Sequence, residues 1–157
     1  MIVLLVILIG IQFIKPKKNV SDVMSANDIT TKYTIPAHVD SLLKTSCYDC
    51  HSNNSYYPWY WGFQPVAWFM NGHIDEGKRH LNFSDFTSYP IFKQYGKLRQ
   101  IKDEVNSGDM PLTSYTLIHR DAILSDLDKS ELDTWVASAR KQLEDSYPPD
   151  SLIKKKN

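Results

Sequence analysis

The segment Cys47-Tyr48-Asp49-Cys50-His51 is the feature that most constrains what this chain can fold into. It contains both cysteines of the chain, so no disulfide framework competes for them. The spacing C-x-x-C-H is the attachment signature of a c-type haem, because two thiols three positions apart can each form a thioether to one porphyrin edge. The adjacent His51 then lies beneath the iron as its proximal ligand. The segment therefore predicts one covalent haem c held by Cys47, Cys50 and His51.

Two other uses of this segment compete with haem attachment. A dithiol redox site also reads C-x-x-C, but it usually opens a helix after a strand, and no strand-rich run precedes Cys47. A structural zinc site needs four close ligands, and the segment supplies three that are near neighbours in sequence. A fourth zinc ligand would have to come from His38, His73 or His80. We favour haem and keep both alternatives open.

Composition narrows the remaining function classes. Lys+Arg and Asp+Glu balance at 18 each, so no strong field favours a nucleic acid or an acidic lipid. Four Trp, nine Tyr and six Phe would suit the wall of a large flat cofactor, although they also suit an ordinary core. The sequence contains no Gly-rich phosphate loop, nucleophile–base motif or paired acid site, so it indicates no small-molecule substrate.

The N-terminal run from Ile2 to Ile14 is apolar except for Gly10 and Gln12. It is short for a membrane span, which takes about 20 residues, and no small-x-small cleavage site follows it. We expect residues 1–18 to form a signal anchor, with a cleaved signal peptide as the alternative. The polar residues 19–34 are expected to be a linker that holds the domain off the membrane.

The charges beside this run conflict with the motif. Lys15, Lys17 and Lys18 follow the apolar run, which by the positive-inside rule favours a cytoplasmic domain. Covalent haem attachment in bacteria instead favours a domain on the opposite side of the membrane, outside the cytoplasm. A start codon placed too late would remove a basic N-terminal region and a few apolar residues. This would explain both the short apolar run and the position of the positive charges. We therefore expect a membrane-anchored domain that faces the periplasm or the cell exterior.

The rest of the chain predicts an all-α domain over residues 35–146 and a disordered tail over 147–157. Apolar residues recur at helical spacing, and nothing alternates convincingly at period two. Gly108 is placed to end a helix in a left-handed cap, and Ser125 with Asp128 has the spacing of a capping box. The apolar stretch from Val66 to Met70 should be buried. Helices are expected from Pro36 into Cys47, from Pro65 onward, from Pro90 to Ser107, and from Ser125 to just before Pro148.

A haem iron bound only by His51 leaves one axial position open. Met110 is the preferred ligand, because it lies in a loop between two predicted helices and Pro111 stiffens its approach. A thioether ligand favours ferrous iron and raises the reduction potential. His73 and His80 are the rival ligands, and either would give a bis-His haem of lower potential.

The order of these elements is similar to a cytochrome c fold. More specifically, the chain resembles the small bacterial haem-binding domain family of membrane-anchored monohaem c-type proteins, over roughly residues 35 to 140. The resemblance implies covalent haem on Cys47 and Cys50, His51 as proximal ligand and Met110 as distal ligand. The matching stretches are Cys47-Tyr48-Asp49-Cys50-His51-Ser52-Asn53, Pro58-Trp59-Tyr60, His80-Leu81-Asn82-Phe83-Ser84, and Met110-Pro111-Leu112 through His119 to Leu124-Ser125-Asp126, with Trp135.

One-electron transfer outside the cytoplasm is the function that this pattern favours. The partners would be redox proteins that the sequence does not identify, and the membrane would be reached through the N-terminal segment. The alternatives are a haem enzyme of peroxidase type, a haem-based sensor, and a subunit of a larger membrane oxidoreductase.

Overall fold

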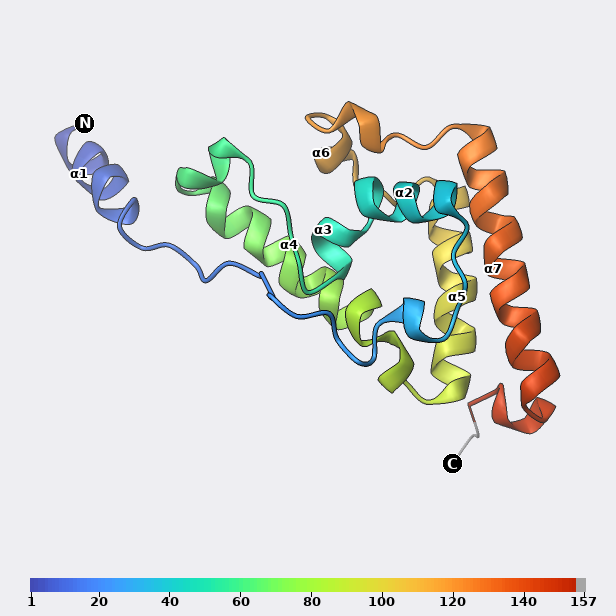
Figure 1. The fold of residues 1–157 in the computed structure, drawn as a ribbon. Helices are drawn as coiled ribbons and strands as arrows, with labels where there is room; N and C mark the ends of the chain where they lie inside the picture. Colours follow the sequence, from blue (N-terminus) through green and yellow to red (C-terminus); the bar gives the residue numbers. More distant parts are fainter. Residues whose placement is uncertain (155–157) are drawn as a thin grey trace.

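The computed structural model describes residues 1–154, and these form helices and loops without a strand. The predicted all-α class is therefore confirmed over this range. Five short 3-10 helices lie between or after the α-helices: η1 Ile29–Thr31, η2 Trp59–Gly62, η3 Phe83–Ser88, η4 Arg120–Ala122 and η5 Pro149–Ser151. The α-helices, in order, are α1 Ile2–Ile11, α2 Ala37–Ser46, α3 Tyr48–His51, α4 Val66–His80, α5 Ile91–Ser107, α6 Thr113–Thr116 and α7 Asp126–Ser146 (Figure 1).

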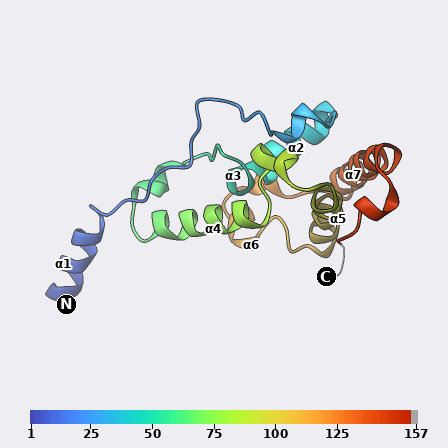
Figure 2. The ribbon, with the colours of Figure 1, turned by 90° about the horizontal axis from the view of Figure 1, so that it is seen from below.

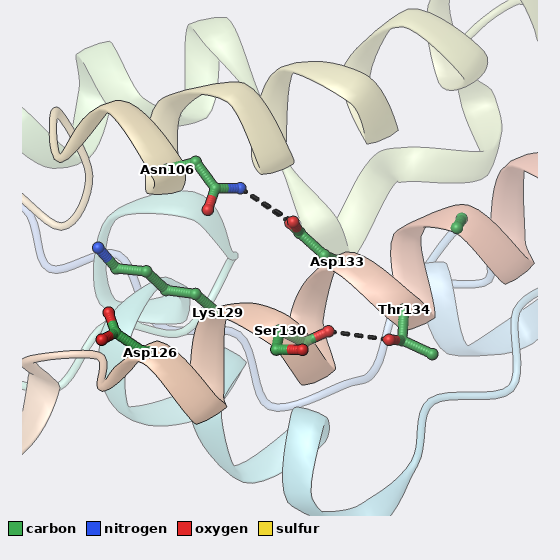
Figure 3. Close-up of a pocket in the computed structure, with 7 residues that line it drawn as sticks. Asn106, Asp126, Lys129, Ser130, Asp133 and Thr134 are labelled. Carbon is green, nitrogen blue, oxygen red and sulfur yellow. Dashed lines mark hydrogen bonds between the residues drawn. The ribbon is translucent and has the colours of Figure 1, made fainter.

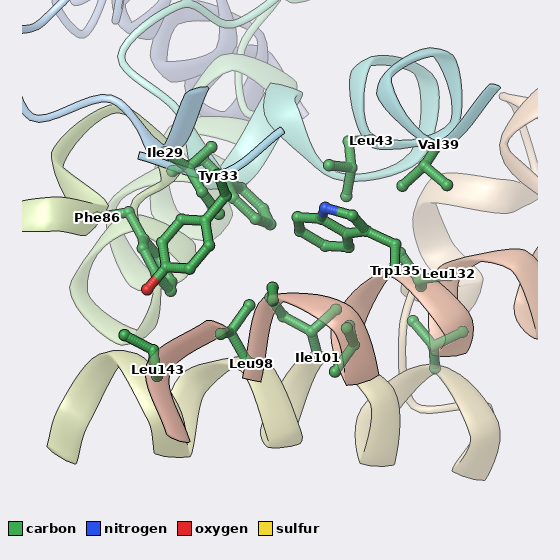
Figure 4. Close-up of a cluster of buried hydrophobic side chains, with 14 residues drawn as sticks. Ile29, Tyr33, Val39, Leu43, Phe86, Leu98, Ile101, Leu132, Trp135 and Leu143 are labelled. Atoms are coloured by element: carbon green, nitrogen blue, oxygen red, sulfur yellow. The ribbon is translucent and has the colours of Figure 1, made fainter. Parts of the chain in front are cut away.

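The core lies between α5, α7 and α2. Helices α5 and α7 run side by side at one end of the molecule, and α1 lies at the other end (Figures 1 and 2). Trp135 of α7 reaches the underside of α2, where Val39 and Leu43 are buried (Figure 4). Its indole N–H also donates to the carbonyl of Thr34 at 3.2 Å. Burial of these large apolar side chains is the main stabilising contribution to this helix packing.

The ends of the two long core helices follow local sequence signals. Gly108 ends α5 with φ of 84°, a left-handed conformation that glycine adopts without a Cβ clash. Ser125 and Asp128 form a reciprocal capping box at the start of α7. Both helix ends predicted from the sequence are confirmed.

Residues 19–34 differ from the separate linker that their polar composition predicted. Ile29 and Tyr33 are 0% and 2% exposed and belong to the core. The hydroxyl of Tyr33 donates to Oε1 of the buried Gln94 at 2.9 Å. Gln94 in turn donates through Nε2 to the carbonyls of Thr87 and Tyr89. Two apolar anchors in a polar stretch are too few to give a periodic signal, so the sequence did not reveal this packing.

Two further segments also differ from expectation. The start of α4 was expected to be buried, but Val66, Trp68 and Phe69 are exposed. Within the expected disordered tail, Pro149–Ser151 forms η5 and Leu152 packs partly against the core. The end of that tail, residues 155–157, lies outside the described residues.

The N-terminal helix α1 is ten residues long and has no buried side chain. Among residues 1–154, no helix is both long enough and apolar enough to span a bilayer.

Replacement of Tyr33 by Phe tests whether residues 29–33 are part of the folded domain. The change removes one of the two donors to the buried Gln94 Oε1, the other being the ammonium group of Lys32. We expect a loss of about 1 kcal/mol in the free energy of unfolding, measured by denaturant titration. Tyr56→Phe is the control, because Tyr56 is 66% exposed. Equal effects of the two changes would contradict the assignment.

Candidate functional site

One cavity of about 480 Å³ is lined by Cys47, Cys50, His51 and Met110. Helix α3 carries the motif to this cavity, the second half of α4 and one face of α5 form its walls, and the loop after α5 supplies Met110. Its volume lies within the range of cofactor pockets, roughly 300–1,000 Å³. Its apolar lining comes from Leu81, Phe83, Ile101, Val105 and Leu112.

The imidazole of His51 is held by the C-terminal end of α4. Its Nδ1 lies 2.9 Å from the carbonyl oxygen of Gly77 and 2.9 Å from that of Leu81. Because a carbonyl can only accept, Nδ1 carries the proton and donates to both, which leaves the lone pair on Nε2. Burial lowers the pKa of His51, although the two carbonyls oppose this shift. The ring is therefore a neutral imidazole with one free nitrogen, the form that binds a metal.

Gly77 allows the motif to approach α4 closely. A Cβ built on Gly77 would lie 2.6 Å from the carbonyl oxygen of Cys50 and 3.1 Å from its Cβ. Any side chain at this position would therefore push α3 away from α4. The sequence analysis did not identify Gly77, and an internal helical glycine is only a weak signal, since Gly72 in the same helix faces open space.

The two thiols are held in their protonated form. Burial raises the pKa of Cys47 to about 12, with a further contribution from Cys50. Burial and the charge of Asp49 raise the pKa of Cys50 to about 11. A redox dithiol site lowers a thiol pKa instead, so this environment does not favour that alternative. Zinc is not favoured either, because residues 1–154 contain no cluster of three or more His, Cys, Asp or Glu suited to a metal ion.

The loop after α5 is tied to the end of that helix. The N–H groups of Asp109 and Met110 both donate to the carbonyl of Glu104 at 3.1 Å. These bonds and the turn at Gly108 direct the chain back, so that Met110 is half-buried beside the core and lines the cavity. The Met110 backbone is thus fixed rather than free.

The rival ligands His73 and His80 line the same cavity from α4. The ring of His73 lies edge-on to Phe69, with 4.4 Å between their centroids. His80 Nε2 lies 2.7 Å from a carboxylate oxygen of Glu76, on an exposed part of the helix. All three candidate distal ligands therefore lie at one cavity, and the geometry alone leaves the choice open.

Tyr115 of α6 is a site residue that the sequence analysis did not single out. It lines the cavity, and its hydroxyl donates to Oδ2 of Asp49 at 2.8 Å. Its ring stacks on His119 at 4.3 Å between centroids, and His119 Nε2 lies 2.7 Å from the hydroxyl of Tyr60. These contacts connect α3 to α6, which follows Met110 in the chain, and to η2, which carries Tyr60. Burial raises the pKa of Tyr115, with Asp49 contributing, so the phenol stays neutral.

A second, open hollow lies between α5 and α7 (Figure 3). Several of its polar groups are paired with one another: Asn106 donates to Asp133 at 3.0 Å and Thr134 donates to the carbonyl of Ser130 at 2.9 Å. It brings together no cysteine or histidine. We assign it no function.

Comparison with known proteins gives one match. A model of the haem-binding domain family matches residues 6–138, which is most of the chain. No curated protein and no solved structure matches. The family resemblance noted from the sequence is thus confirmed, and the match begins before residue 35, at residue 6, and ends at residue 138.

Gly77→Ala, compared with Gly72→Ala, tests the close approach of α3 to α4. The Cβ at position 77 would overlap Cys50, so we expect a loss of about 1–3 kcal/mol in unfolding free energy. At position 72 the same change meets open space, so we expect no loss or a gain of up to about 1 kcal/mol. Denaturant titration of both haem-loaded variants measures the difference. Similar stability of the two variants would be inconsistent with the contact.

Proposed function

Because the chain belongs to the haem-binding domain family, we propose that it holds one haem c covalently and transfers single electrons. One observation carries the proposal: both thiols of the motif, the free nitrogen of His51 and the thioether of Met110 border a single, largely apolar cavity. This donor set fits a haem. The two thiols would hold the porphyrin edge, and the two axial donors would complete the iron coordination.

Each thiol has a defined covalent role. Cys47 and Cys50 would hold the haem through thioether bonds, each made by addition of the S–H group across a vinyl group, with sulfur on one vinyl carbon and the proton on the other. No oxidant is consumed. His51 presents Nε2 in a fixed orientation, because the carbonyls of Gly77 and Leu81 hold Nδ1. Lys97 also lines the cavity and offers an ammonium group to a propionate.

Electron transfer is favoured over catalysis by the proposed second axial ligand. When bound, the haem supplies an iron that gains and loses one electron. Met110 would supply the iron with a second, neutral and soft donor, which would favour the ferrous state and raise the potential. Ile101, Val105 and Leu112 give the same cavity an apolar wall. A haem held by both His51 and Met110 would suit an electron carrier of cytochrome c type.

A second candidate function is kept because His73, Glu76 and His80 border the same cavity. Either histidine could replace Met110 as ligand, or act as a distal base in a haem enzyme of peroxidase type. A sensor or a subunit of a membrane oxidoreductase would use the same open position. Rapid reaction of the resting protein with peroxide, or tight carbon monoxide binding without ligand displacement, would favour these alternatives.

The proposed location is the outer face of a membrane, the periplasm in a Gram-negative cell. Covalent haem attachment outside the cytoplasm and the exposed apolar residues 1–14 support it. Redox proteins are the proposed partners. The direct test of the whole proposal is an absorption spectrum of the purified protein in both redox states, with a pyridine haemochrome and extraction by acidified acetone. We expect a c-type spectrum and pigment that stays with the protein.

Cys50→Ala should leave the haem attached through Cys47 alone. The pyridine haemochrome band should then move to longer wavelength, because one vinyl group stays unsaturated. Ser46→Ala is the matched control, since Ser46 also lines the cavity but carries no thiol. An unshifted band in Cys50→Ala would argue against a thioether at this position.

Met110→Ala should open the sixth coordination position. We expect loss of the far-red band of the ferric protein and a potential lower by at least about 60 mV, a tenfold change in a one-electron equilibrium. Met70→Ala is the control, because Met70 lies on α4 but does not line the cavity. If the spectrum and potential of Met110→Ala are unchanged, another residue binds the iron.

A further inference from the structure

The stretch between Asp49 and Asp75 is unusual in having no charged residue. It contains no Asp, Glu, Lys or Arg, although these make up 23% of the chain. Large apolar side chains in this stretch nevertheless lie on the surface: Trp59 is 81% exposed, Phe63 56% and Phe69 58%. We call these three side chains the aromatic face. They come from η2, the start of α4 and the turn between them.

The segments that carry the aromatic face, η2 and the start of α4, lie at the same end of the molecule as α1 (Figures 1 and 2). Both α1 and the residues that follow it, up to Ile14, are largely exposed and, apart from Gly10 and Gln12, apolar. The surface of a soluble domain seldom exposes so much contiguous apolar area unless something binds there. The helix and the aromatic face together therefore form an extended apolar surface at one pole.

Hydrogen bonds fix the N-terminal segment to α4. Gln12 and Gln64 are joined twice, by Gln64 N–H to Gln12 Oε1 at 2.9 Å and by Gln12 Nε2 to the Gln64 carbonyl at 3.2 Å. Gln64 Nε2 also donates to the carbonyl of Ile14 at 2.6 Å. Further along, Asn71 Nδ2 donates to the carbonyl of Lys17 at 2.9 Å. Gln64 and Asn71 are only 5% and 9% exposed, so the domain's side of each of these bonds is buried.

Lysines follow the apolar segment where it reaches the domain. Lys15 and Lys17 are exposed. The ammonium group of Lys18 lies 4.7 Å from the ring centre of Trp61 and 5.2 Å from that of Tyr57. At a membrane–water interface, apolar side chains lie deepest, aromatic rings lie at the boundary and lysines reach the headgroups. The groups of this segment follow the same order. The cations would meet anionic lipid headgroups.

We propose that the domain rests directly on a lipid bilayer through the aromatic face. Residues 1–14 lie among the acyl chains, Trp59, Phe63 and Phe69 dip into the interface, and Lys15 and Lys17 bind anionic headgroups. This inference builds on the membrane association proposed above for the N-terminal segment, and replaces a domain held off the membrane by a linker. Continuity with the apolar segment and the adjoining lysines favours lipid over a protein partner.

Helix α4 joins the lipid-facing end to the cavity. Phe69 of the aromatic face and Gly77 beside the motif lie on the same helix, about 12 Å apart along its axis. The helix is rigid on this scale, so lipid contact at one end would set the height of the cavity above the bilayer.

The experiment uses the haem-loaded full chain in vesicles of phosphatidylcholine and phosphatidylglycerol, with a phospholipid that carries a diazirine in its acyl chain. After irradiation, mass spectrometry maps the adducts. We expect adducts in residues 1–14 and in residues 56–72. The exposed Leu117 and Ile118 of the α6 region are the internal control and should stay unlabelled.

Matched variants sharpen the test. Trp59→Ser/Phe63→Ser/Phe69→Ser should lose the adducts in 56–72 and bind vesicles about tenfold more weakly, because three aromatic side chains no longer leave water. Leu117→Ser/Ile118→Ser removes similarly exposed apolar side chains and should change binding less than about twofold. The single change Trp59→Ser serves if the triple variant does not fold. Circular dichroism checks each variant.

The outcomes separate this inference from the membrane proposal on which it builds. Adducts confined to residues 1–14 would overturn the inference and keep the N-terminal membrane contact. Adducts in residues 56–72 without any in residues 1–14 would support lipid contact by the aromatic face and contradict the proposed N-terminal anchor. No adduct in either region would overturn both. Self-association or binding to another protein that the triple variant abolishes, without lipid adducts, would assign the face to a protein instead.

Discussion

The hydrogen bond that Nδ1–H of His51 shares between the carbonyls of Gly77 and Leu81 is the interaction on which the site depends. This shared bond forms at the end of α4, where the Leu81 carbonyl lies just past the last helical residue and the Gly77 carbonyl accepts from the imidazole as well as from the Leu81 N–H. It also demands that α3 lie against α4, which Gly77 permits by lacking a side chain. One contact therefore sets the ring orientation, the tautomer and the distance between two helices. Phe83, 1% exposed and edge-on to the ring, packs beside it.

A low-polarity cavity explains the charge state of the groups around it. The same burial lowers the pKa of His51 and raises the pKa of both thiols, so all three are neutral when the fold forms. Neutral sulfur and nitrogen donors suit a flat, largely apolar macrocycle better than charged ones, because no buried charge is left without a partner. A catalytic thiol or a zinc site would require the opposite, namely a thiolate.

Signals confined to neighbouring residues were predictable from the sequence. The periodic stripe of α5, the cap at Gly108 and the capping box at Ser125 each depend on a few consecutive residues. What the sequence could not show depended on contacts between distant segments. Tyr33 is buried in the core and bonds to Gln94. At the start of α4 only Ala67 is buried, and the larger side chains of Trp68 and Phe69 face outward. The sequence does not show whether an apolar residue packs against the core or lies on the surface. The helix over α4 was therefore predicted correctly, but the burial of its first residues was not.

The paired bonds between Gln12 and Gln64 hold the N-terminal segment against the residues that lead into α4. On a lipid surface, such a domain could rotate about the membrane normal but could not tumble. Its cavity would always open at the same tilt, and its encounters would come by lateral diffusion. A redox partner would then have to lie in the same membrane, or extend far enough from elsewhere to contact the cavity at this membrane surface. The orientation of the domain, rather than its affinity, would then mainly determine which partners it can use.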